Sequence, residues 1–181
     1  MNRSQKQDER DQVQVQTPDG QDIPEERALQ EYNAEVLDSQ PGLREVFLAQ
    51  LMEVPEPDED AAVKIVGTIL GAETAEELDR PWDTDGMRTL YNRPLVVNSI
   101  TRRPSDFRGG LGAYLGCDCT DPDTGERLFV TCGSVSSVAQ LVRAHTLGLF
   151  PLTVVPVPAK RPTKMGYLPY HLEIDQRRRL T

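Results

Sequence analysis

The chain has 181 residues, 38% of them hydrophobic, which is enough for one folded domain with a core and additional segments. Its formal net charge is −9, but residues 1–60 contain 5 basic and 16 acidic side chains, whereas residues 91–181 contain 12 basic and 7 acidic ones. No stretch approaches the ~20 apolar residues that span a bilayer. The N-terminal residues hold no apolar run typical of a secretory signal. We therefore expect a cytoplasmic protein without a membrane partner.

The N-terminal half divides into an arm and a helical segment. Residues 1–40 are rich in Gln, Asp and Glu and poor in large apolar side chains, which predicts a disordered acidic arm. Residues 41–90 are predicted to form helices that flank the following domain. Apolar residues at helical spacing mark 41–54 and 61–70, and a capping box opens a short helix over 74–78. The first of these helices either packs as a cap on the domain or dimerises, or it docks a partner.

Residues 91–176 are predicted to form the main domain, because five short stretches have the composition of strands and one helix lies between the third and fourth. The strands are expected at Leu95–Thr101, Ala113–Cys119, Arg127–Cys132, Leu152–Val157 and Tyr167–Ile174, and the helix from a capping box at Ser137 to about Thr146. This order is that of the OB-fold, a mainly β, five-stranded Greek-key barrel that binds oligonucleotides or oligosaccharides on strands 2 and 3. Residues 177–181 would form a basic tail.

The alternation of side chains along strands 2 and 3 places aromatic residues on the predicted binding face. If the apolar set of each strand faces the core, then Tyr114, Arg127 and Phe129 face outward, with Gly116 leaving room between them. Aromatic rings on an open sheet can stack on the bases of a single strand. The alternative is that the N-terminal helices cover this face and the two rings are buried packing.

Cations lie in the two loops that would close over such a ligand, one between strands 1 and 2 and one between strands 4 and 5. Six cations and two aromatic residues in these loops fit a groove that follows a phosphodiester backbone, and a histidine on strand 5 shares the outward face. The residues predicted to contact nucleic acid are Arg102, Arg103, Phe107, Arg108, Tyr114, Arg127, Phe129, Lys160, Arg161, Lys164, Tyr167 and His171.

Three segments of this domain resemble a known family. They are PLVVNSITRRPSDFRGGLGAYLGCDC, TGERLFVTCGSVSSVAQLVRAHTLGLFPLTVV and KRPTKMGYLPYHLE, and the chain is similar through them to the OB-fold single-stranded DNA-binding proteins of tailed bacteriophages. The resemblance covers about residues 61–175. It implies a protein that coats and protects single strands in phage DNA replication or recombination, without sequence preference, in the host cytoplasm. One departure is the basic end at Arg177–Arg179, since bacterial-type single-strand binders commonly end in an acidic tail.

Catalysis and metal binding are not expected. Cys117, Cys119, Cys132 and His145 could suggest a zinc site, but two cysteines at i and i+2 on a strand chelate one ion poorly, and their alternation assigns them to the core. A Cys132–His145 nucleophile pair is disfavoured because the histidine lies at the core edge of its helix. We expect no enzyme activity, no cofactor and no metal.

A second function stays open on the sequence, that of an OB-fold protein–protein adaptor whose acidic N-terminal arm and helix recruit replication or recombination proteins. The arm could also compete electrostatically with DNA for the cationic groove, in which case its removal would tighten binding. The choice between DNA and RNA, and homo-oligomerisation, are likewise open.

Overall fold

The computed structural model describes residues 14–17, 19–57, 70–71, 73, 75, 85–105 and 111–175. The helices predicted at 61–70 and 74–78 fall almost wholly outside these residues. Phe107, Arg108 and the basic tail also lie outside them. Among the described residues, no helix is both long and apolar enough to cross a membrane.

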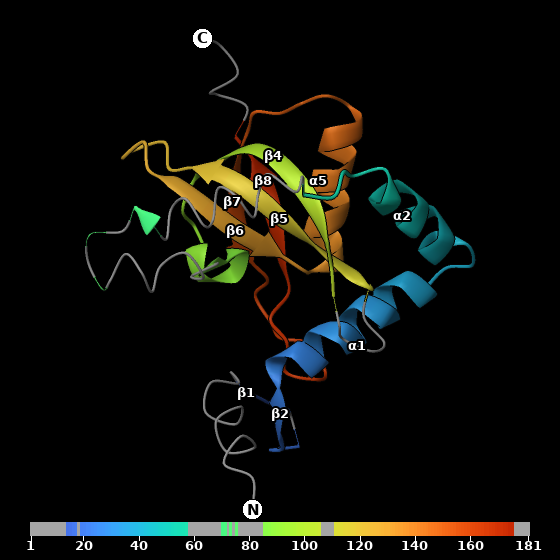
Figure 1. Ribbon diagram of the computed structural model, residues 1–181. Coiled ribbons are helices and arrows are strands. Elements are labelled where there is room, and N and C mark those ends of the chain that lie inside the picture. The colour runs from blue at the N-terminus through green and yellow to red at the C-terminus, as the bar shows by residue number, and fades with distance from the viewer. Residues whose placement is uncertain are drawn as a thin grey trace, which may run out of the picture.

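Five antiparallel strands form the main sheet, with the helix α5 (Val135–Thr146) between the third and the fourth, as predicted (Figure 1). The strands are β4 (Leu95–Pro104), β5 (Ala113–Thr120), β6 (Arg127–Cys132), β7 (Leu152–Pro158) and β8 (Tyr170–Ile174). Their order in the sheet is β6-β5-β4-β7-β8, and β3 (Asp85–Gly86) adds to β6 in parallel. Because β4 lies between β5 and β7, the first four strands have Greek-key order.

The sheet is not closed into a barrel, which corrects the predicted fold. Closure would pair β6 with β8, but α5 side chains occupy the edge of β8 instead. The hydroxyls of Ser136 and Ser137 donate to the carbonyl of Tyr170, at 3.1 and 3.2 Å. The amide of Gln140 accepts from the backbone N of Leu172 and donates to its carbonyl, at 2.9 and 2.8 Å. These side chains satisfy the edge that a closing strand would use.

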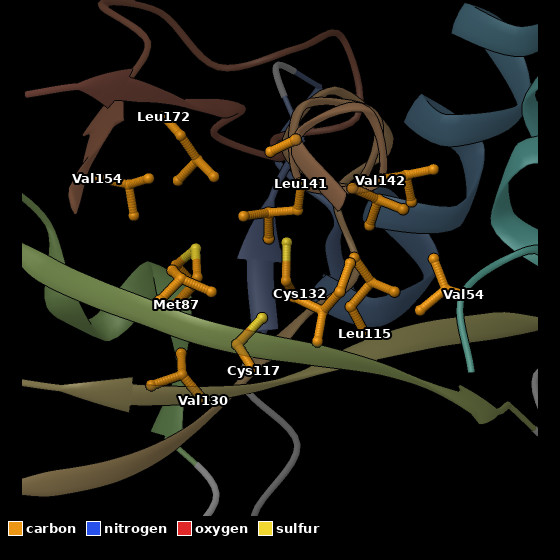
Figure 2. Packing of buried hydrophobic residues seen from close by; sticks show 14 of the residues in the cluster. Val54, Met87, Leu115, Cys117, Val130, Cys132, Leu141, Val142, Val154 and Leu172 are labelled. Carbon is orange, nitrogen blue, oxygen red and sulfur yellow. The ribbon is translucent and has the colours of Figure 1, made fainter. Parts of the chain in front are cut away.

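Helix α5 covers the core side of the sheet. It begins at Val135, two residues before the predicted start, so Ser137 lies inside the helix rather than capping it. Its buried residues meet apolar side chains of the strands, among them Leu115, Val130 and Leu172 (Figure 2). The helix ends at a left-handed glycine, Gly148, whose φ is +65°.

The N-terminal region is folded over most of residues 14–54, which corrects the disorder predicted for residues 14–40. It contains β1 (Gln14–Gln16) paired with β2 (Asp22–Pro24), then α1 (Glu25–Asp38) and α2 (Leu43–Met52). The second helix was predicted; the first was not. Four of these residues belong to the same core as the sheet: Leu37, Phe47, Leu51 and Val54. The fold is therefore mixed, with three α-helices in the described residues and a short 3₁₀ helix, η3 (Met87–Leu90).

A buried asparagine joins α1 to α5. Asn33 is 3% exposed, and its amide group donates to the carbonyl of Gly133 at 2.9 Å and accepts from the backbone N of Val135 at 2.8 Å. Ser134, the residue before the helix, makes no side-chain cap. Asn33 thus satisfies a free N–H at the first turn of α5 from about 100 residues away in the sequence.

Replacing Asn33 by alanine should destabilise the fold. The change leaves the buried Val135 N–H and the partly buried Gly133 carbonyl without the Asn33 amide, at a cost of about 1–3 kcal/mol in unfolding free energy. Urea denaturation measures this loss. Asn98→Ala is the matched control, because within the described residues its amide makes a single bond, to the Thr120 hydroxyl. Equal losses of unfolding free energy in the two variants would show that the bonds from Asn33 stabilise the fold no more than the Asn98–Thr120 bond does.

Candidate nucleic-acid interface

Strand β4 is longer than predicted, and this separates two arginines expected to act together. The strand continues to Pro104, so Arg102 and Arg103 are strand residues with side chains on opposite faces. Arg102 is 16% exposed in its side chain and forms an ion pair with Glu56 at 2.7 Å. Its backbone N also donates to the carbonyl of Pro55 at 2.8 Å. Arg102 therefore anchors the segment after α2 to the edge of β4.

Arg103 lies on the outer face, where it meets the predicted aromatic residues. It is opposite Tyr114 in the β4–β5 register, and its guanidinium carbon lies 4.6 Å from the ring centroid of Phe129. This is cation–π geometry. The Nε of Arg103 is buried and has no hydrogen-bond partner in the described structure.

Gly116 makes this packing possible. A Cβ at Gly116 would overlap Cζ of the Phe129 ring and lie 2.9 Å from Nε of Arg103. The ring therefore lies across β5 at the position where any other residue would place a side chain. The structure thus brings together three of the predicted site residues, Arg103, Tyr114 and Phe129, on one partly exposed surface. We call this surface, with Gly116, the aromatic platform.

One end of the aromatic platform carries an ion pair between Arg127, a predicted contact, and Asp118, which was not among the predicted contacts. Asp118 is opposite Phe129 in the β5–β6 register and pairs with Arg127 at 2.5 Å. The side chain of Arg127 is 76% exposed, so the pair lies at the surface. The alternation of 114, 116 and 118 places Asp118 on this face, and its carboxylate lowers the local positive charge.

The loop between β7 and β8 forms a second candidate element, residues 159–169, which we call the cationic hairpin. Its arms are joined by bonds from Ala159 N to the carbonyl of Pro169 and from Thr163 N to the carbonyl of Tyr167, each 2.7 Å. Lys160, Arg161 and Lys164 are exposed, as a phosphate contact requires.

Two further predicted contacts, Tyr167 and His171, also lie away from the aromatic platform. Tyr167 is 3% exposed and packs with Ile23 and Ala28, and its ring centroid lies 5.3 Å from that of Tyr32. It is a core residue, and this burial raises its pKa. His171 is exposed on β8, but β4 and β7 lie between β8 and β5 in the open sheet. Its expected place on the binding face depended on barrel closure.

The three cysteines are free and buried. Burial raises the pKa of Cys132 to about 11 and that of Cys119 to about 12, and it raises that of Cys117 as well. These shifts disfavour the thiolate that a zinc ligand or a nucleophile needs. No group of three or more His, Cys, Asp or Glu side chains able to hold a metal occurs in the described part of the chain.

No family model, curated protein or solved structure matches this chain. The similarity to phage single-strand binders therefore stays a prediction from the sequence alone.

Gly116→Ala should disrupt the aromatic platform. The added methyl group forces the Phe129 ring and Arg103 to move, and overpacking of this kind costs about 1–3 kcal/mol. Thermal or urea unfolding measures the change. Gly133→Ala is the control, because its Cβ would meet only Leu29, at 3.6 Å. If Gly116→Ala is as stable as Gly133→Ala, the ring is not confined as described.

A buried carboxylate in the β5–β6 turn predicts a pH effect on stability. Hydrogen bonds from Arg93, and from the backbone N of Asp123 and of Thr124, hold the pKa of Asp121 below its ordinary value. Its stabilising contribution is therefore present above the unfolded-state pKa of ~3.9 and is lost as the pH falls through the lower folded-state pKa. Asp121→Asn should destabilise the protein at pH 7.

The difference in urea midpoint between wild type and Asp121→Asn should shrink as the pH falls below about 4. Glu126→Gln, in the same turn, controls for the loss of one carboxylate. A difference that stays constant down to pH 2 would contradict the ionised hydrogen-bonded state of Asp121.

Proposed function

We propose that this protein binds single-stranded nucleic acid, with single-stranded DNA as the main ligand, across the outer face of β4, β5 and β6. The observation that carries the proposal is the packing of Arg103 and Phe129 over Gly116. A ring and a guanidinium that lie across an open sheet offer flat surfaces to bases, and stacking contributes about 1–3 kcal/mol per base. Stacking tolerates any sequence because every base has a π-face.

The topology supports the same proposal. The OB-fold is a partly open, five-stranded Greek-key barrel whose ligands lie on strands 2 and 3. Here the corresponding strands are β5 and β6, and they carry Tyr114 and Phe129. We propose an OB-like sheet that remains open because α5 occupies the edge of β8. On this proposal the protein coats and protects single strands, in phage replication or recombination if the family resemblance holds.

The cationic hairpin would contribute the electrostatic part of binding. Each phosphate that a cation neutralises on a single strand adds a slope of about −0.7 to the dependence of log affinity on log salt. Lys160, Arg161 and Lys164 are exposed and take part in none of the ion pairs within the described residues. They are therefore available to phosphates.

The proposal is tested by titrating the full chain with fluorescent poly-dT, a mixed-sequence strand and a hairpin duplex. Both single strands should bind more tightly than the duplex, and affinity should fall linearly with salt on a log–log scale. Phe129→Ala should weaken poly-dT binding roughly 5- to 150-fold, which is the loss of one stacked base. Circular dichroism and the melting temperature would show that the variant is folded.

Arg103→Gln and Arg143→Gln form a matched pair for this test. Each removes one positive charge, but Arg143 is exposed on α5 and lies outside the aromatic platform. Arg103→Gln should weaken binding, whereas Arg143→Gln should change it little. Equal effects, no binding at low salt, or equal binding of duplex would each count against the proposed function.

A further inference from the structure

The cationic hairpin is held by the N-terminal region rather than by the main sheet alone. At its turn, Gly166 has a φ of +82°, and an added Cβ would overlap the carbonyl oxygen of Gln16 and lie 3.0 Å from its carbonyl carbon. The hairpin backbone is therefore packed directly against β1. Only glycine satisfies both the left-handed φ and the close approach at this position.

Apolar packing continues this contact along the hairpin. Tyr167 is buried in a small cluster with Ile23 of β2 and Ala28 of α1. Val15, Leu29, Tyr32 and Met165 are partly buried around this cluster. The hairpin thus contributes two side chains to a core whose other members all come from residues 15–32.

The carboxylates of the N-terminal region form their ion pairs elsewhere. Glu25 pairs with Arg88, Glu31 with Arg27, Asp38 with Arg44 and Glu56 with Arg102. None of these pairs, among the described residues, involves a cation of the hairpin. The contact between the N-terminal region and the hairpin is therefore apolar and steric, and it leaves the three hairpin cations exposed.

We infer that residues 15–32 position the cationic hairpin for phosphate contact, with Gly166 as the positioning residue on the hairpin side. The inference rests on the proposed function. Ordering the backbone of a free loop costs about 1–2 kcal/mol per residue. In a loop that is already ordered in the folded protein, this cost does not reduce the binding free energy. The N-terminal region would then assist strand binding, whereas a competing acidic arm would oppose it.

Gly166→Ala tests this inference, because it disturbs the contact with β1 without changing any charge. Gly42→Ala is the matched control, since Gly42 has a φ of +79° and nothing within 4 Å of an added Cβ. Poly-dT binding of the full chain would be measured over a range of salt concentrations. Gly166→Ala should weaken binding and make the slope of log affinity against log salt shallower by up to ~2. This is the contribution of three phosphate contacts at about 0.7 each. Gly42→Ala should keep the wild-type slope.

Combining Gly166→Ala with the charge-removing variant Lys160→Gln/Arg161→Gln/Lys164→Gln separates positioning from general damage. If the contact with β1 acts through these cations, Gly166→Ala should add little further loss once they are gone. Fully additive losses would overturn the inference. So would a Gly166→Ala protein that binds more tightly than wild type, which is the result expected of a competing arm.

A second variant and a second measurement make the result independent of how Gly166→Ala folds. Val15→Ser weakens the contact from the β1 side and should give the same change of slope. Trypsin should cleave after Lys160 and Lys164 faster in both variants than in wild type or Gly42→Ala. If cleavage accelerates but the salt slope stays at the wild-type value, the inference is wrong and the proposed function stands. If the wild type itself binds no single strand, both are wrong.

Discussion

The docking of α1 on the start of α5 is the constraint on which the rest of the structure depends. Asn33 supplies both bonds, to Gly133 and Val135, and so completes the first turn of α5. That helix in turn supplies the side chains that bond β8. Three residues of α1, Ala28, Leu29 and Tyr32, also belong to the cluster that holds the cationic hairpin. One buried amide thus links the N-terminal region, the helix and the far edge of the sheet.

The open sheet follows from that arrangement and changes the shape of the candidate site. In a closed barrel β8 would lie beside β6, and His171 would approach Phe129. With α5 bonded to the edge of β8, the two strands meet only through side chains, where Cys132 Sγ lies 3.5 Å from the hydroxyl of Tyr170. The candidate interface is therefore a sheet face over β4, β5 and β6 rather than a groove closed on both sides, and the cationic hairpin is a separate element.

Local patterns predicted the elements well, and long-range contacts explain the errors. Alternation and turn residues placed all five strands, with β6 correct to the residue. Composition predicted disorder over residues 1–40 because Gln, Asp and Glu are frequent there and large apolar residues are few. The structure instead buries Asn33 of that segment against partners about 100 residues away. Tyr167 was predicted to contact nucleic acid because it opens strand 5 next to the cationic loop, and its burial likewise depends on residues far away in the sequence. In the folded protein the Tyr167 ring packs against the ring of Tyr32 from α1, so it is not available to a base.

The net charge of −9 is a poor guide to what a nucleic acid would meet. Exposed charges act over about 10 Å at 0.1 M salt, so the distribution matters more than the sum. Several N-terminal carboxylates are held by arginines away from the hairpin, including Glu25 by Arg88 and Glu56 by Arg102. Arg102 pairs with Glu56 and does not lie on the aromatic platform. Its neighbour Arg103 does, because adjacent strand residues face opposite sides of the sheet. An N-terminal region in which several carboxylates pair with arginines away from the hairpin can therefore support the cationic hairpin without neutralising it.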